Sequence, residues 1–163
     1  MSDNIHFARS LVKGRIAETI FAQMFRDSGK YTVLEFGYEK IVPEIMRQSY
    51  NRENPIIESL RVAPDFAVID QTTKEVRLIE VKYRWRLNAD DILECAKKMH
   101  ASWNPSYLFI ATLDGFYFDE INKIISKNGN ISPLVDLSAE MQSNYLQILI
   151  DFEKSTPSIN RLV

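Results

Sequence analysis

The stretch from Val62 to Arg86 reads VAPDFAVIDQTTKEVRLIEVKYRWR and predicts a β-hairpin. Its two arms, residues 65–69 and 76–83, are rich in β-branched and aromatic side chains. The polar segment DQTTKE between them has the composition of a turn. Two antiparallel strands in the middle of the chain are therefore the expected centre of the fold.

The register of this hairpin brings ionisable side chains together. With the turn centred on its two threonines, Asp65 lies directly opposite Glu80. Because strand side chains alternate between faces, Glu80 and Lys82 share one face and their apolar neighbours occupy the other. Two adjacent carboxylates repel each other unless a cation lies between them, and their oxygens suit Mg²⁺. The alternative is a solvated ion pair of little energetic value, which the apolar run around Glu80 disfavours.

Pro64-Asp65, followed after the turn by Glu80-Val81-Lys82, resembles the PD-(D/E)xK motif of the restriction-endonuclease-like nuclease superfamily. The predicted order of helix, strand, hairpin, helix and strand also looks like the αβββαβ core of that superfamily. The resemblance implies an α/β fold with a mixed central sheet flanked by helices and a C-terminal helix added. Within the superfamily, the segment 14–18 (GRIAE) looks closest to Holliday-junction-resolvase-like members.

The same resemblance implies a metal-dependent nuclease, specifically an endonuclease, that hydrolyses DNA phosphodiester bonds with Mg²⁺ or with Mn²⁺ as a substitute. Asp65, Glu80 and the backbone carbonyl of Val81 would bind the ion. Lys82 would orient or activate the attacking water. Glu18, on the first helix, would complete the catalytic and metal-binding set by holding a second ion or its water shell.

Glu18 stands out within the helix predicted over Ala8–Ser28. At helical spacing it lies in the middle of an apolar arc that includes Leu11 and Phe21. An acidic side chain in such a position needs a partner. The alternative to a metal site is that Glu18 reaches water or pairs with Arg15.

Basic residues after the motif are candidates for contacts with the DNA backbone. Arginines alternate with Trp85 directly after the hairpin, a pattern that can bind phosphates and stack on bases. Alternatively, Trp85 covers the edge of the core, and the lysines late in the next helix complement its dipole. The candidate DNA-binding residues are Arg84, Arg86, Lys97, Lys98 and Arg15.

The rest of the chain supplies the remaining elements of the predicted fold. A near-continuous apolar run after the second helix indicates a buried strand parallel to the hairpin. The expected elements are a strand over Lys30–Lys40, a short helix opening at Pro43, a helix over Ala89–Ser102 with Asn88 as its N-cap, strands over Ser106–Leu113 and from Phe116, a helix over Ser138–Phe152, and a mobile tail.

Composition indicates one domain spanning residues 1–163, with 45% hydrophobic and 26% charged residues. A single cysteine, Cys95, excludes an internal disulfide, and the sequence offers neither a membrane span nor a signal region. A cytoplasmic protein without membrane contact is expected.

The net charge of −2 is unusual for a protein that binds nucleic acid, because phosphate contacts favour a basic surface. Two alternatives to an autonomous nuclease follow. The chain could be a catalytically silent binding or interaction module on the same fold, or a nuclease subunit whose partner supplies DNA affinity. Branched DNA as substrate and a symmetric homodimer are further expectations, since cleavage of two strands suits two-fold symmetry.

Overall fold

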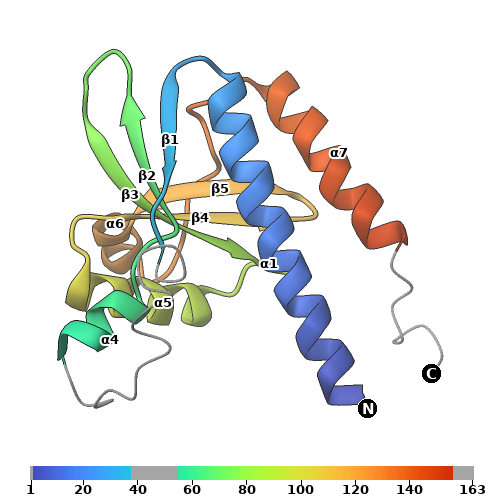
Figure 1. Ribbon diagram of the computed structural model, residues 1–163, viewed down its shortest axis with the longest axis horizontal. Helices are drawn as coiled ribbons and strands as arrows, with labels where there is room; N and C mark the ends of the chain where they lie inside the picture. The colour runs from blue at the N-terminus through green and yellow to red at the C-terminus, as the bar shows by residue number, and fades with distance from the viewer. Residues whose placement is uncertain (1, 38–54, 156–163) are drawn as a thin grey trace.

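The computed structural model describes residues 2–37 and 55–155, which form a five-stranded mixed sheet with helices on both faces (Figure 1). The strand order is β1-β2-β3-β4-β5, and β3 and β4 are the parallel pair. The strands are β1 (Tyr31–Glu35), β2 (Phe66–Asp70), β3 (Val76–Tyr83), β4 (Tyr107–Thr112) and β5 (Gly115–Glu120). The helices are α1 (Ser2–Asp27), α4 (Pro55–Arg61), α5 (Ala89–Ser102), α6 (Ile121–Ser126) and α7 (Ala139–Ser155).

The predicted α/β fold is confirmed in its element order and in its mixed sheet. The hairpin β2–β3 has the expected register, because Phe66 pairs with Ile79. Helix α5 has the predicted bounds, and the Asn88 side chain caps it by accepting a hydrogen bond from the Asp91 N–H at 3.0 Å. The connection through α5 makes β4 the parallel neighbour of β3, as the apolar run of β4 indicated.

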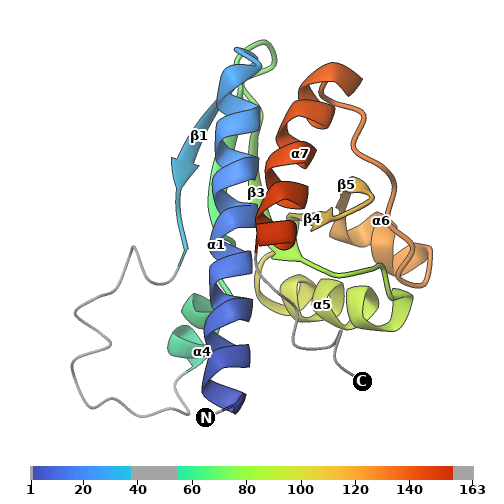
Figure 2. The same cartoon turned by 90° about the vertical axis from the view of Figure 1, so that its right-hand side faces the viewer.

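Two layers of helices cover the sheet (Figure 2). Helices α1 and α7 run side by side on one face, where the Phe21 ring lies 5.1 Å from that of Phe66 and 5.0 Å from that of Phe109. Helices α5 and α6 pack on the opposite face, over a second cluster that includes Leu108 and Ile110 of β4. The central strands are therefore covered on both faces. Their side chains can reach solvent only near the ends of the strands.

Some sequence expectations need correction. Helix α1 begins at Ser2 instead of Ala8, and α6 was not predicted. Leu11 was expected on the buried face of the first helix but is 55% exposed. The buried part of α1 starts at Ala17, because the N-terminal half of the helix extends beyond the sheet (Figure 2). Helical periodicity does not reveal where the covering sheet stops.

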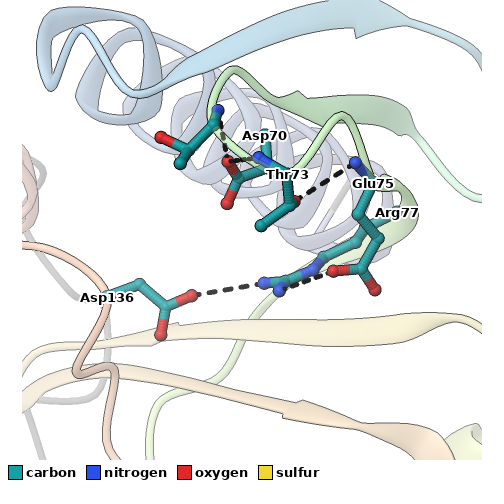
Figure 3. Close-up of polar contacts among 6 residues, drawn as sticks. Asp70, Thr73, Glu75, Arg77 and Asp136 are labelled. Atoms are coloured by element: carbon teal, nitrogen blue, oxygen red, sulfur yellow. Dashed lines mark hydrogen bonds and ion pairs between the residues drawn. The ribbon is translucent and has the colours of Figure 1, made fainter.

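At the turn end of the hairpin, charges are arranged in matched contacts (Figure 3). The Asp70 carboxylate accepts hydrogen bonds from the N–H groups of Thr73 and Thr72, and these bonds lower the pKa of Asp70. The Arg77 guanidinium lies between Glu75 at 3.1 Å and Asp136 at 3.4 Å. It also lies over the Tyr107 ring, 5.2 Å from its centre, so this end of the hairpin is fastened to the segment before α7.

Several expectations fall outside the described residues: the end of the first strand near Lys40, the short helix at Pro43, and the tail after Ser155. Within the described ranges, no helix is long and apolar enough to cross a membrane.

Candidate active site

Asp65 is held at the open end of the hairpin, one residue before β2 begins. Its backbone carbonyl accepts a hydrogen bond from the Phe36 N–H at 2.8 Å, which ties it to the end of β1. Its side-chain Oδ2 accepts a hydrogen bond from the Val81 N–H, also at 2.8 Å. The carboxylate thus replaces the next rung of the β2–β3 ladder. Continuing the observed register by one residue puts Asp65 opposite Glu80, as predicted.

Glu80 and Lys82 form an ion pair at the end of β3, with 2.5 Å between Oε1 and Nζ. Both side chains are partly buried, with exposed fractions of 14% for Glu80 and 35% for Lys82. The residues that alternate with them, Ile79 and Val81, belong to the core beneath α1. The shared face of Glu80 and Lys82 was predicted from this alternation and is confirmed.

Burial in this corner acts against ionisation of its carboxyl groups. Burial, followed by the negative charge of Glu80, raises the pKa of Asp65 to about 7. Burial also raises the pKa of Glu80, against the attraction of Lys82. For Lys82, burial acts to lower the pKa but the contact with Glu80 outweighs it, so its pKa is raised. One ammonium therefore faces two half-buried carboxyls that cannot both ionise without cost.

Glu18 lies on α1 and lines the same cavity as Asp65 and Glu80. Its Oε2 accepts a hydrogen bond from Arg15 Nη1 at 3.3 Å, which is the pairing that the sequence left open as an alternative. Across the described ranges, no three acidic, histidine or cysteine side chains are grouped so that they could hold a metal ion. The structure thus pairs Glu80 with Lys82, holds Asp65 on the Val81 N–H between them in sequence, and places Glu18 on the wall of the same cavity.

The cavity beside Lys82 has a volume of about 410 Å³ and continues the open end of the hairpin. The β2–β3 ladder stops at Phe66, so beyond it side chains from α1 and from the end of β3 border the same space. Gly14 of α1 lines this opening, and a Cβ at that position would meet no atom within 4 Å. A second cavity of about 540 Å³ runs from Asp65 along α1 toward the end of β1.

The predicted DNA-binding residues have different surroundings. Arg84 is fully engaged: Nε and Nη2 contact Asp91 at 2.5 and 3.4 Å, and Nη1 donates to the Tyr83 carbonyl at 3.0 Å. Arg86, two residues further on, is exposed, and Arg15 lines the cavity that runs from Asp65 along α1. Lys97 and Lys98 lie on the exposed side of α5, where Lys98 pairs with Glu94 at 2.8 Å. Their contact with DNA stays a prediction.

One group of side chains at the site was missed by the sequence analysis. Glu153 of α7 accepts a hydrogen bond from the Tyr83 hydroxyl at 2.9 Å and pairs with Lys13 of α1 at 2.6 Å. The Lys13 ammonium also lies 5.3 Å from the centre of the Tyr83 ring. Tyr83 follows Lys82 directly, so the C-terminal helix is fastened beside the site. No local pattern indicates this contact, since its members come from three distant segments.

Comparisons with known proteins add a distant structural similarity. No family model and no curated protein matches the chain. Among solved structures, the chain is similar to Hjc, a Holliday junction resolvase from the archaeal hyperthermophile Archaeoglobus fulgidus. The similarity covers 80% of this chain and 98% of that chain, with 11% sequence identity and a TM-score of 0.39. These values are too low to carry an argument about activity, and the case for the site rests on its own residues.

Proposed function

We propose that this protein is a metal-dependent nuclease that hydrolyses phosphodiester bonds of DNA, with its active site at the open end of the β2–β3 hairpin. The observation that carries the proposal is the half-buried pair of carboxyls, Asp65 and Glu80, next to the ammonium of Lys82. Shifted pKa values with identified charged partners, beside a cavity, favour a functional site. A purely structural role would not need two carboxyls in this corner.

The donor set fits a hard divalent cation such as Mg²⁺. Asp65 and Glu80 offer carboxylate oxygens, the ligands that Mg²⁺ prefers. Val81 offers a third oxygen through its backbone carbonyl. The N–H and C=O of one strand residue point toward the same neighbouring strand, and the Val81 N–H points at Asp65. Its carbonyl is therefore directed to the same side as the carboxylates. Glu18, on the cavity wall, would hold a second ion or an outer water.

When bound, the ion would polarise the phosphate and offset the charge that grows as the P–O bond breaks. Lys82 contributes from the protein side. Its raised pKa keeps the side chain protonated at neutral pH, which favours orienting the attacking water and stabilising the anionic phosphate over removing a proton. Arg15 on the cavity wall and the exposed Arg86 would attract the strand, a local patch that compensates for the net charge of −2.

The first test compares Lys82→Ala with Lys74→Ala, the same change at the opposite end of the hairpin. Plasmid and branched DNA are incubated with Mg²⁺ or Mn²⁺, with EDTA as the metal-free control. We expect Lys82→Ala to slow cleavage by about 10²- to 10⁴-fold, because it removes a group that acts on the transition state. Lys74→Ala should cleave at the parent rate. Equal cleavage by both variants, or cleavage in EDTA, would contradict the proposal.

A catalytically silent binding module is the second candidate. It is favoured by the finding that the described ranges hold no group of three metal-ligating side chains and by the engagement of Glu80 with Lys82. Titration of the intact protein with Mn²⁺ in a calorimeter separates the two candidates without using activity. Binding that disappears in Asp65→Asn supports the nuclease, whereas no binding at millimolar Mn²⁺ supports the module.

A further inference from the structure

Trp85 is the most prominent exposed aromatic side chain next to the candidate active site. It lies two residues after the end of β3, and 63% of its surface is exposed. The indole makes no hydrogen bond or ring contact with any residue that the structure describes. The alternative that Trp85 covers the edge of the core is disfavoured, because most of its surface is exposed.

The other tryptophan of the chain shows what a structural role looks like. Trp103 is half-buried at the end of α5, and its indole N–H donates to the Ser59 carbonyl at 2.8 Å. Its ring also packs edge-on against Phe36, with 5.5 Å between the ring centres. Single exposed apolar residues are common on protein surfaces, so exposure alone does not assign a role to Trp85. A role is indicated by the anchored loop that carries Trp85 and by its position next to the candidate active site.

The short loop that carries Trp85 is anchored on both sides. Before it, the Arg84 backbone N–H donates to the Ala111 carbonyl at 2.9 Å, and the Arg84 guanidinium forms an ion pair with Asp91. After it, Asn88 caps α5 through the N–H of the same Asp91. Three residues, 85–87, span the interval between these anchors. Such anchors leave the loop backbone with little freedom to lose on binding, which favours affinity.

The position of Trp85 matches a base next to the bond that would be cut. Trp85 follows Lys82 by three positions, so the two Cα atoms lie within about 11 Å of each other, the reach of an extended chain. Arg86 supplies a positive charge on the exposed side. A nucleic acid strand offers both a flat aromatic base and a phosphate to this pair of side chains, and stacking on an exposed aromatic ring does not depend on base identity.

We propose that Trp85 stacks on an unpaired base beside the scissile phosphate, so that the substrate of this site is a strand with unpaired bases at or near the cleavage point. The inference rests on the proposed nuclease function and names its substrate class. In a duplex, both faces of each base are covered by neighbouring bases, and exposing one costs unstacking energy. Arg84 then acts as the anchor of the loop, and Trp85 and Arg86 contact the strand.

The experiment measures tryptophan fluorescence in EDTA, where no cleavage occurs. The Trp103→Phe variant leaves Trp85 as the single tryptophan, and the Trp85→Phe variant leaves Trp103. Each is titrated with a dT oligomer of about 12 nucleotides, which covers one typical single-strand site, and with a duplex of equal length. We expect the dT oligomer to quench the Trp85 signal, the duplex to quench it much less, and the Trp103 signal to stay constant. A U oligomer distinguishes RNA from DNA as the source of the unpaired base.

Affinity provides the second measurement. Trp85→Ala should bind the dT oligomer about 5- to 150-fold more weakly than the parent, the value of one base stacked on an aromatic ring, with duplex binding unchanged. Equal affinity of parent and variant for the dT oligomer would overturn the inference, as would an equal loss on duplex. A changed oligomeric state with unchanged DNA affinity would also overturn it and would assign Trp85 to a protein interface.

The outcomes separate this inference from the nuclease proposal. If the parent cleaves DNA with Mg²⁺ but Trp85→Ala binds the dT oligomer like the parent, the stacking inference fails alone. If Trp85 fluorescence is quenched by the dT oligomer but no metal-dependent cleavage is found, the nuclease proposal fails alone.

Discussion

At the turn end of the β2–β3 hairpin the carboxylate of Asp70 accepts two backbone N–H groups and that of Glu75 pairs with a guanidinium. At the open end, Asp65 accepts one backbone N–H and shares a half-buried corner with Glu80 and a single ammonium. The consequences for ionisation are opposite. The pKa of Asp70 is lowered by its hydrogen bonds with Thr73 and Thr72, and the pKa of Asp65 is raised by burial and by Glu80.

The turn end thus carries charges that stabilise the folded state, and the open end carries charges that are unfavourable within it. At the turn end, ionised side chains stabilise the folded state. At the open end, ionising both carboxyls costs stability, and a bound cation would remove that cost. A site that is unfavourable on its own and favourable with a ligand is the pattern expected where function, and not stability, has selected the residues. Three predictions, from the largest expected effect to the smallest, test this contrast.

The largest effect is expected from Glu80→Gln compared with Glu75→Gln, the same change at the two ends of the hairpin. Glu80→Gln removes one carboxylate from the proposed metal site, so cleavage should fall by about 100-fold or more and the affinity for Mn²⁺ should drop with it. Glu75→Gln should leave both unchanged and lower the thermal midpoint slightly, because Arg77 loses an ionic partner. Similar cleavage by the two variants would abolish the distinction between the ends.

The second prediction concerns the pH dependence of stability in EDTA. Because the pKa of Asp65 is about 7 in the fold and about 3.9 when unfolded, the folded state binds the extra proton between these values. The contribution of this proton to the free energy of unfolding is therefore fully present below pH 4 and is lost as the pH rises through 7. Asp65→Asn should be more stable than the parent at pH 8, by on the order of a few kcal/mol, and the difference should shrink toward pH 4. Urea unfolding at several pH values measures it.

Asp70→Asn is the matched control for that experiment, and the opposite sign is expected. The folded state lowers the pKa of Asp70, so the ionised carboxylate favours folding at neutral pH. Its stabilising contribution is present above the unfolded pKa and is lost as the pH falls. Asp70→Asn should thus lower the thermal midpoint at pH 8. If both variants shift stability in the same direction, the electrostatic contrast between the two ends is wrong.

The smallest effect is expected from Arg77→Met, which keeps the apolar length of the side chain but removes the guanidinium between Glu75 and Asp136. The free energy of unfolding should fall by about 1–2 kcal/mol, the range for partly buried charged hydrogen bonds, with some relief because Arg77 Nε is buried without a partner in the described structure. Mn²⁺ affinity should not change. A more stable variant would show that the turn end does not stabilise the fold through these contacts.

The sequence was most informative where the pattern is local. Alternation along β3 predicted the shared face of Glu80 and Lys82, and the two threonines of the turn predicted the register that brings Asp65 opposite Glu80. The cap at Asn88 and the apolar run of β4 likewise follow from short segments. These features depend on neighbours in the chain or across a tight turn, so they can be inferred without tertiary information.

The sequence was least informative where distant segments meet. The helical spacing of α1 put Leu11 with the buried residues, but the sheet does not reach that far along the helix. Arg84 is a basic residue beside the motif, yet its guanidinium is committed to Asp91 of α5. The contact of Tyr83 with Glu153 has no signal in either segment alone. Such contacts are decided by how helices are placed over the sheet.

The hydrogen bond between Tyr83 and Glu153 also has a consequence for the order of events during synthesis. The two residues are 70 positions apart, and protein synthesis adds about 5–20 residues per second, so roughly 4–14 s pass between the appearance of β3 and that of its partner in α7. During that interval Asp65, Glu80 and Lys82 already exist, but neither Tyr83 nor Lys13 has its carboxylate partner. The corner beside Lys82 therefore reaches its final form only after most of the chain has been made, and a nascent chain that stops before α7 leaves it incomplete.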